Sequence, residues 1–171
     1  MGSKNNGRTT LEVGADGVAV ITIINPPVNS LSPDVLYSLK ESYDEALQRD
    51  DVKAIVVTGA NGKFSGGFDI TSFDGMQSGK VEQPKLGFVS VEIVSDTLEA
   101  AKKPSVAAID GLALGGGLEV AMACHARIST PTAQLGLPEL QLGVIPGFGG
   151  TQRLPRLVGL TKSLEMMLVC G

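Results

Sequence analysis

The sequence predicts an α/β fold in which parallel strands are joined by helical crossovers. Short runs of β-branched and other apolar residues recur along the chain, and an amphipathic helical pattern separates the first two of them. Such alternation is typical of parallel sheets, because parallel neighbours need a crossover connection. Neither a composition shift nor a tandem repeat divides the 171 residues, so we expect one domain.

The first expected strand covers residues 17–25, which are rich in β-branched side chains and stop at two prolines. A helix follows, since Ser32 is a good N-cap and Pro33 suits the first helical position. The apolar residues that would form the buried face of this helix are Val35, Leu36, Leu39, Tyr43 and Leu47. Residues 53–59 predict a second strand, apolar throughout, as buried parallel strands tend to be.

The second half of the chain continues the alternation. The elements expected there are an irregular polar stretch at 71–86, a helix at 91–102, a strand at 105–109, a helix from the glycine triplet to about Cys124, short strands at 127–130 and 133–135, turns at 143–150, and a helix that starts at Thr161.

Composition restricts the class of function. Hydrophobic residues make up 43% and charged residues 19%, which is typical of soluble globular domains. A net charge of −4 argues against broad binding of nucleic acid or membrane surfaces. Cys124 and Cys170 have no metal-ligand spacing, so we expect no metal site and two free thiols in a reducing compartment. Residues 1–6 lack the apolar stretch of a signal peptide.

Two glutamates stand nearly alone in long uncharged stretches. Glu119 is the only charged side chain between Asp110 and Arg127, and Glu139 is the only one between Arg127 and Arg153. Such apolar surroundings predict burial, which raises the pKa of a carboxyl toward the range of a general acid or base. Each glutamate also has a structural alternative: an ion pair with Arg127 for Glu119, and a turn or cap for Glu139.

Two glycine-rich segments could bring a ligand close to the backbone. Residues 64–70, Phe-Ser-Gly-Gly-Phe-Asp-Ile, would offer the N–H of Phe68, and the triplet Gly115–Gly117 would offer an N–H at a helix N-terminus. A tight turn and close helix packing are the structural alternatives. We expect the only histidine, His125, to cap a helix or lie on the surface, and residues 146–150 to form a turn without a chemical side chain.

Together these segments resemble the crotonase superfamily, the enoyl-CoA hydratase/isomerase family, over about residues 11–170. The most specific parts are residues 64–70, 110–119 and 137–154. Residues 1–4 and 64–70 are most similar to the N-terminal hydratase region of plant peroxisomal fatty-acid β-oxidation multifunctional proteins. The resemblance implies an N-terminal tail (1–10) and a crotonase-like ββα spiral (11–171) that lacks the family's C-terminal helical part.

The resemblance also implies the site and the reaction. The backbone N–H groups of Phe68 and Gly116 would form an oxyanion hole for a thioester carbonyl, and Glu119 and Glu139 would be the catalytic carboxylates that hydrate a trans-2-enoyl-CoA. The residues expected to bind the substrate are Lys63, Gly66, Gly67, Asp69 and Ile70, with Lys63 near the CoA phosphates.

CoA would enter as part of the substrate, with no separate cofactor. The resemblance suggests a homotrimer or a larger multifunctional chain in the peroxisome. A peroxisomal targeting tripeptide is absent at Gly171, so the location would be cytosolic if the chain ends there. Δ3-Δ2-enoyl-CoA isomerase activity, or a catalytically weak acyl-CoA-binding or assembly fragment, are the alternatives.

Overall fold

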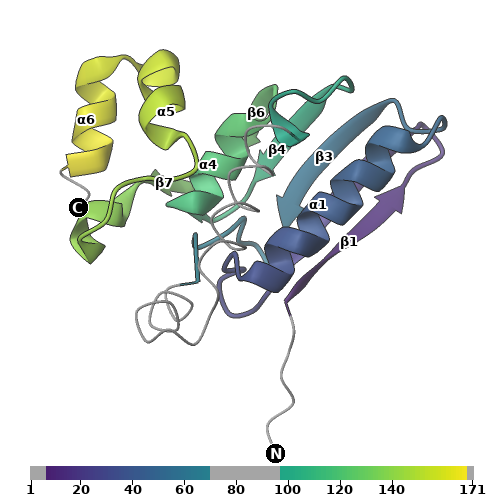
Figure 1. The fold of residues 1–171 in the computed structure, drawn as a ribbon, viewed down its shortest axis with the longest axis horizontal. Coiled ribbons are helices and arrows are strands. Elements are labelled where there is room, and N and C mark those ends of the chain that lie inside the picture. Colours follow the sequence, from purple (N-terminus) through teal and green to yellow (C-terminus); the bar gives the residue numbers. More distant parts are fainter. Residues whose placement is uncertain (1–6, 70–96, 169–171) are drawn as a thin grey trace, which may run out of the picture.

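The computed structural model describes residues 7–69 and 97–168 (Figure 1). The strands are β1 (Arg8–Val13), β2 (Val18–Ile24), β3 (Ala54–Gly59), β4 (Ser105–Ile109), β5 (Leu112–Leu114), β6 (Ala126–Ser129) and β7 (Gln134–Gly136). The helices are α1 (Pro33–Gln48), α4 (Gly116–Ala123), the 3-10 helix η2 (Pro138–Leu142), α5 (Gly150–Val158) and α6 (Leu160–Leu168).

The main sheet has the order β1-β2-β3-β4-β6. All its neighbouring pairs are parallel except β1 and β2, which form an antiparallel hairpin. The predicted α/β architecture with crossover connections is therefore confirmed. The irregular stretch at 71–86 and residues 91–96 of the helix expected at 91–102 lie outside the described residues. The remainder of that expected helix, residues 97–102, does not form an α-helix.

Strand β1 corrects one expectation, because residues 8–10 pair with β2 and are not part of an N-terminal tail. The run Arg-Thr-Thr carries no apolar signal, yet Thr9 is buried. Its hydroxyl is 2.9 Å from that of Ser38 and 2.7 Å from that of Ser42, so α1 supplies its polar partners. The pairing thus depends on contacts with α1, which the local sequence does not show.

Helix α1 covers one face of the main sheet (Figure 1). Ser32 accepts a hydrogen bond from the N–H of Val35, and Pro33 opens the helix, as predicted. The predicted apolar face is buried except for Leu47, which is partly buried. It packs in one core with Ile21, Ile23, Ile55 and Val57 of the sheet. Burying each such side chain stabilises the fold by about 1.5–3 kcal/mol before conformational entropy is counted.

A second, smaller sheet lies beside residues 65–68. It contains β5 and β7 in parallel, and two isolated bridges add neighbouring segments to it. One bridge joins Ser65 to Ala113 and the other joins Phe68 to Leu31. Residues 65–68 therefore run between Leu31 on one side and β5 on the other. Figure 1 shows α4 between the main sheet and the end of the molecule that holds α5 and α6.

Candidate active site

The backbone of residues 65–68 is fixed on both sides. The N–H of Ser65 donates to Leu112 at 3.0 Å, and the carbonyl of Ser65 accepts from Leu114 at 3.0 Å. On the other side, the N–H of Leu31 donates to the carbonyl of Gly67 at 2.7 Å, and its carbonyl accepts from Asp69 at 3.3 Å. In parallel pairing of this kind the intervening N–H, that of Phe68, points away from Leu31.

The side chains of Asn29 and Ser65 form hydrogen bonds with the backbone in and around this segment. The sequence analysis identified neither residue. Asn29 is buried and has a φ of 54°. Its side-chain amide donates to the backbone carbonyls of Ala60 and Lys63, each at 2.8 Å. The backbone carbonyl of Asn29 accepts from the Ser65 hydroxyl at 2.8 Å. The hydroxyl oxygen of Ser65 in turn accepts from the N–H of Gly67 at 3.2 Å. An Asn after two prolines, a common left-handed turn residue, was the available signal.

The start of α4 lies against the same segment. Gly115, the N-cap, has a φ of 51° and donates its N–H to Gly136 in β7 at 2.9 Å. Gly116 is the first helical residue, so its N–H has no acceptor within the helix. A Cβ built on Gly67 would lie 3.5 Å from the nitrogen of Gly116. The peptide that links Gly67 to Phe68 therefore lies beside the first N–H of the helix, an arrangement suited to an oxyanion hole.

The packing alternative for the glycine triplet also holds in part. A Cβ on Gly117 would lie 2.7 Å from both Cβ and O of Ser65, and one on Gly116 would lie 3.2 Å from the ring of Phe148. Gly117 thus lets α4 approach residues 65–68 closely. Packing and the supply of a backbone donor are compatible, because they use different atoms of the same three residues.

Glu119 is buried, as predicted, with 1% of its surface exposed. Its Oε1 accepts hydrogen bonds from the N–H groups of Phe148 at 2.9 Å and Gly150 at 2.7 Å. Gly150 is the first residue of α5, so the carboxylate lies at a helix N-terminus, where negative charge is favoured. The pKa of Glu119 is nevertheless raised from 4.5 to about 7. Burial is the main cause and the nearby Glu139 adds to it, while the two N–H groups and Arg153 oppose the rise.

The ion pair considered for Glu119 is not formed. Arg127 instead donates from Nη1 to the carbonyls of Met122 at 3.3 Å and Cys124 at 2.8 Å, at the C-terminal end of α4. The turn at 146–150 was expected to lack chemical side chains, and its contribution is made by backbone N–H groups. The partner of Glu119 is therefore a turn 29 to 31 residues away along the chain.

Glu139 lies in η2, immediately after β7. Its Oε2 is buried and has no hydrogen-bond partner among the residues that the structure describes. Burial raises the pKa of this carboxyl as well. A Cβ on Gly115 would lie 3.0 Å from its Oε1, so the carboxyl faces the N-cap of α4. Glu139 does occupy a turn of 3-10 helix, but its backbone carbonyl, not its carboxylate, accepts the capping bonds.

The other expected residues have the following positions. Gly66 packs against Val28, since a Cβ there would lie 2.9 Å from that side chain. The ammonium of Lys63 donates to the carbonyl of Pro27 at 2.9 Å. Asp69 is partly buried, and Ile70 lies outside the described residues. His125 is exposed, as the surface alternative predicted, and its Nδ1 accepts from the N–H of Ser105, the first residue of β4, at 3.2 Å, which is not a helix cap.

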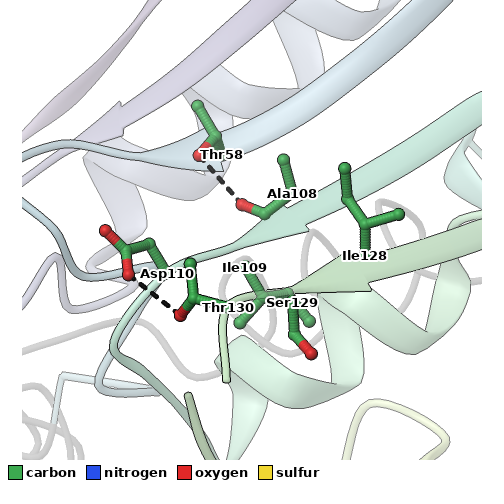
Figure 2. Close-up of a pocket in the computed structure, with 7 residues that line it drawn as sticks. All are labelled: Thr58, Ala108, Ile109, Asp110, Ile128, Ser129 and Thr130. Atoms are coloured by element: carbon green, nitrogen blue, oxygen red, sulfur yellow. Dashed lines mark hydrogen bonds between the residues drawn. The ribbon is translucent and has the colours of Figure 1, made fainter. Parts of the chain in front are cut away.

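Figure 2 shows a pocket elsewhere, at the carboxyl ends of β3, β4 and β6. Its volume is about 270 Å³, and it includes none of the expected site residues. Both threonine hydroxyls in it are already bonded: Thr58 donates to the carbonyl of Ala108 at 2.9 Å, and Thr130 donates to Asp110 at 3.1 Å. Because none of the expected site residues lines this pocket, we place the candidate site at the two glutamates.

Within residues 7–69 and 97–168, no group of three or more His, Cys, Asp and Glu side chains is placed to hold a metal ion. In the same part of the chain, no helix is long and apolar enough to cross a membrane. Cys124 is a buried free thiol, as expected, and Cys170 lies outside the described residues.

Several known proteins are similar to this chain in sequence. Over 168 residues, the chain is 78% identical to the glyoxysomal fatty acid beta-oxidation multifunctional protein MFP-a of Cucumis sativus, covering 98% of this chain and 23% of that protein. It is 76% identical to the peroxisomal fatty acid beta-oxidation multifunctional protein MFP2 of Arabidopsis thaliana, with the same coverage. The chain thus spans about a quarter of the length of these curated relatives.

Solved structures give the same fold. Pseudomonas aeruginosa DspI matches with a TM-score of 0.85 and 36% identity, over 96% of this chain and 66% of that one. An enoyl-CoA hydratase from Thermoplasma volcanium matches with a TM-score of 0.86 and 27% identity, over 95% and 64%. The crotonase-like fold is thereby confirmed for the part of it that the chain contains. Residues 14–171 match the family described as Enoyl-CoA hydratase/isomerase, and the chain belongs to that family.

Proposed function

We propose that this chain catalyses the reversible hydration of a trans-2-enoyl-CoA to a 3-hydroxyacyl-CoA in fatty-acid β-oxidation. The observation that carries the proposal is the placement of two carboxyls with raised pKa values, Glu119 and Glu139, around the N-terminus of α4. The same N-terminus lies beside the Gly67–Phe68 peptide. Hydration next to a thioester needs this combination of an oxyanion hole and two proton-transfer groups.

In the proposed mechanism, the N–H groups of Phe68 and Gly116 bind the thioester oxygen and stabilise the enolate that forms. Glu119 orients a water molecule and takes its proton as the water oxygen bonds to C3. Glu139 delivers a proton to C2. The two N–H bonds to Oε1 of Glu119 support its orienting role, because they fix the direction of the carboxylate. Glu139 contributes to the raised pKa of Glu119, so the two acids titrate as a coupled pair.

The substrate contacts are part of the same proposal. The acyl-CoA would pass Gly66, Gly67, Asp69 and Ile70, and its phosphates would meet the ammonium of Lys63, which has three N–H donors and uses one on Pro27. No separate cofactor takes part. The names of the peroxisomal and glyoxysomal relatives support a peroxisomal setting within a larger multifunctional chain. Assembly as a homotrimer is the alternative that we propose.

A crotonyl-CoA hydration assay on the 171-residue chain tests the proposal. Glu119→Gln and Glu139→Gln should each abolish most turnover while acyl-CoA binding persists, because Gln keeps the shape but cannot exchange the proton. The loss of turnover in the double variant, expressed as a free energy, should be far smaller than the sum of the two single losses. Glu41→Gln, at an exposed position of α1, is the matched control. Near-wild-type turnover in both single variants would exclude the two-carboxylate mechanism.

Isomerisation is the second candidate, since the family's description includes isomerases. It needs the enolate and one acid–base group but no positioned water. Incubation with a 3-enoyl-CoA separates the two reactions: the isomerase would form the 2-enoyl-CoA without hydration. Binding of acyl-CoA without turnover of either substrate would identify an acyl-CoA-binding or assembly fragment.

A further inference from the structure

Arg153, in α5, contacts the turn that binds Glu119. Its Nη1 donates to the carbonyl of Phe148 at 2.6 Å. Its Nη2 forms an ion pair with Glu99 at 2.5 Å. The side chain of Arg153 is 11% exposed and that of Glu99 is 57% exposed, so the guanidinium is largely enclosed and Glu99 anchors it from the solvent side. Arg153 has no place in the proposed proton transfers.

Three successive peptide groups of the turn form hydrogen bonds with different partners. The first and the third donate the N–H groups of Phe148 and Gly150 to Glu119. The middle one presents the Phe148 carbonyl, which Arg153 holds. Gly149 adopts the left-handed conformation, with a φ of 88°. Alternating left- and right-handed residues direct N–H groups to one side, which is the geometry of an anion-binding nest.

The glycine also leaves room for the guanidinium. A Cβ at position 149 would overlap Nη1 of Arg153. Gly149 therefore both sets the conformation of the turn and leaves space for the side chain of Arg153. If the middle peptide rotated, the two flanking N–H groups would no longer converge on Oε1 of Glu119.

We propose that Arg153 is a positioning residue for Glu119, which it serves by fixing the middle peptide of this turn, with Glu99 as its anchor. The catalytic consequence rests on the proposed function. The charged groups that act on Glu119 from the packed elements are Glu139 of η2 and Arg153 of α5, with opposite signs: Glu139 raises the pKa of Glu119, and Arg153 lowers it.

Four variants separate the contribution of the Arg153 charge from those of its planar guanidinium and of its anchor, Glu99. Arg153→Gln removes the charge, while Arg153→Lys keeps the charge but loses the planar fork. Glu99→Gln removes the anchor and leaves both active-site carboxyls in place. Arg156→Gln is the matched control: it is an exposed arginine on the same helix that donates to the carbonyl of Gln152.

The primary measurement is a ¹³C NMR titration of the Glu119 carboxyl in the 171-residue chain, assigned with Glu119→Gln. Arg153→Gln should raise the apparent pKa by about 0.5–1, the size expected for loss of a screened nearby cation. Arg153→Lys should raise it less, and Arg156→Gln should leave it unchanged. This reading needs no substrate, so it stands even if the proposed hydratase activity fails.

The second measurement is the pH profile of kcat/KM for crotonyl-CoA hydration. Its low-pH limb should move up with the NMR value, which lowers kcat/KM about 3- to 10-fold on that limb in Arg153→Gln. Glu99→Gln should reduce kcat with little change in KM, and it carries the test if Arg153→Gln does not fold. An unchanged Glu119 pKa in Arg153→Gln, or wild-type kcat in Glu99→Gln, would overturn the proposal.

Discussion

Glu119→Gln should make the stability of the protein much less dependent on pH, although it removes a proposed catalytic group. The pKa of Glu119 is 4.5 in its ordinary state and about 7 when folded, mainly because burial disfavours its charge. The difference of about 2.5 pH units corresponds to about 3 kcal/mol at about 1.4 kcal/mol per unit. Because only 1% of the side chain is exposed, solvent screening reduces this cost little.

The sign follows from proton binding. Between pH 4.5 and about 7, the folded state keeps the Glu119 proton and the unfolded state loses it. The stabilisation that the folded state gains by binding this proton is therefore fully present below pH 4.5 and is lost as pH rises through about 7. A neutral Gln does not titrate, so the free energy of unfolding of the variant, relative to wild type, should rise by about 2–3 kcal/mol from pH 5 to pH 8.

Urea denaturation at the two pH values measures this change directly. In thermal melts, about 2–3 kcal/mol corresponds to a relative gain of roughly 4–12 °C in Tm for a chain of this size. Glu41→Gln, at an exposed position, should change stability equally at both pH values. If Glu119→Gln behaved like Glu41→Gln, the buried glutamate would not carry the raised pKa, and its assignment as a group poised near neutral pH would be wrong.

Three further substitutions test the surroundings of the site. Gly116→Val should reduce crotonyl-CoA turnover far more than His125→Ala, because its Cβ would lie 3.2 Å from the Phe148 ring at the proposed oxyanion donor; a larger loss in His125→Ala would refute the site assignment. Asn29→Ala should lower the free energy of unfolding by about 2–4 kcal/mol in urea denaturation, since two partly buried carbonyls lose their donor at a left-handed residue; a loss below about 1 kcal/mol would contradict this. Lys63→Ala should raise KM several-fold at low salt with little change in kcat, and an unchanged KM there would count against a phosphate contact.

The sequence alone determined the α/β class and most elements of the main sheet. Runs of β-branched residues and a helix start at Ser32 and Pro33 are local signals, and the observed elements agree with them. Local polarity also predicted the burial of Glu119, because a lone charge in a long apolar stretch has few ways to stay in water. Strand β1 escaped prediction, since its polar residues obtain their partners from α1.

Only the tertiary structure decided which groups meet at the site. Arg127 is close to Glu119 in the sequence but bonds to the end of α4, whereas the partners of Glu119 come from the turn before α5. Those partners are backbone N–H groups, which nearly every residue carries, so no residue type marks them in advance. Arg153 likewise acts on a carbonyl, and its role follows from where the chain folds back. The candidate carboxylates could therefore be proposed from their isolation in the sequence, but their hydrogen-bond partners required the fold.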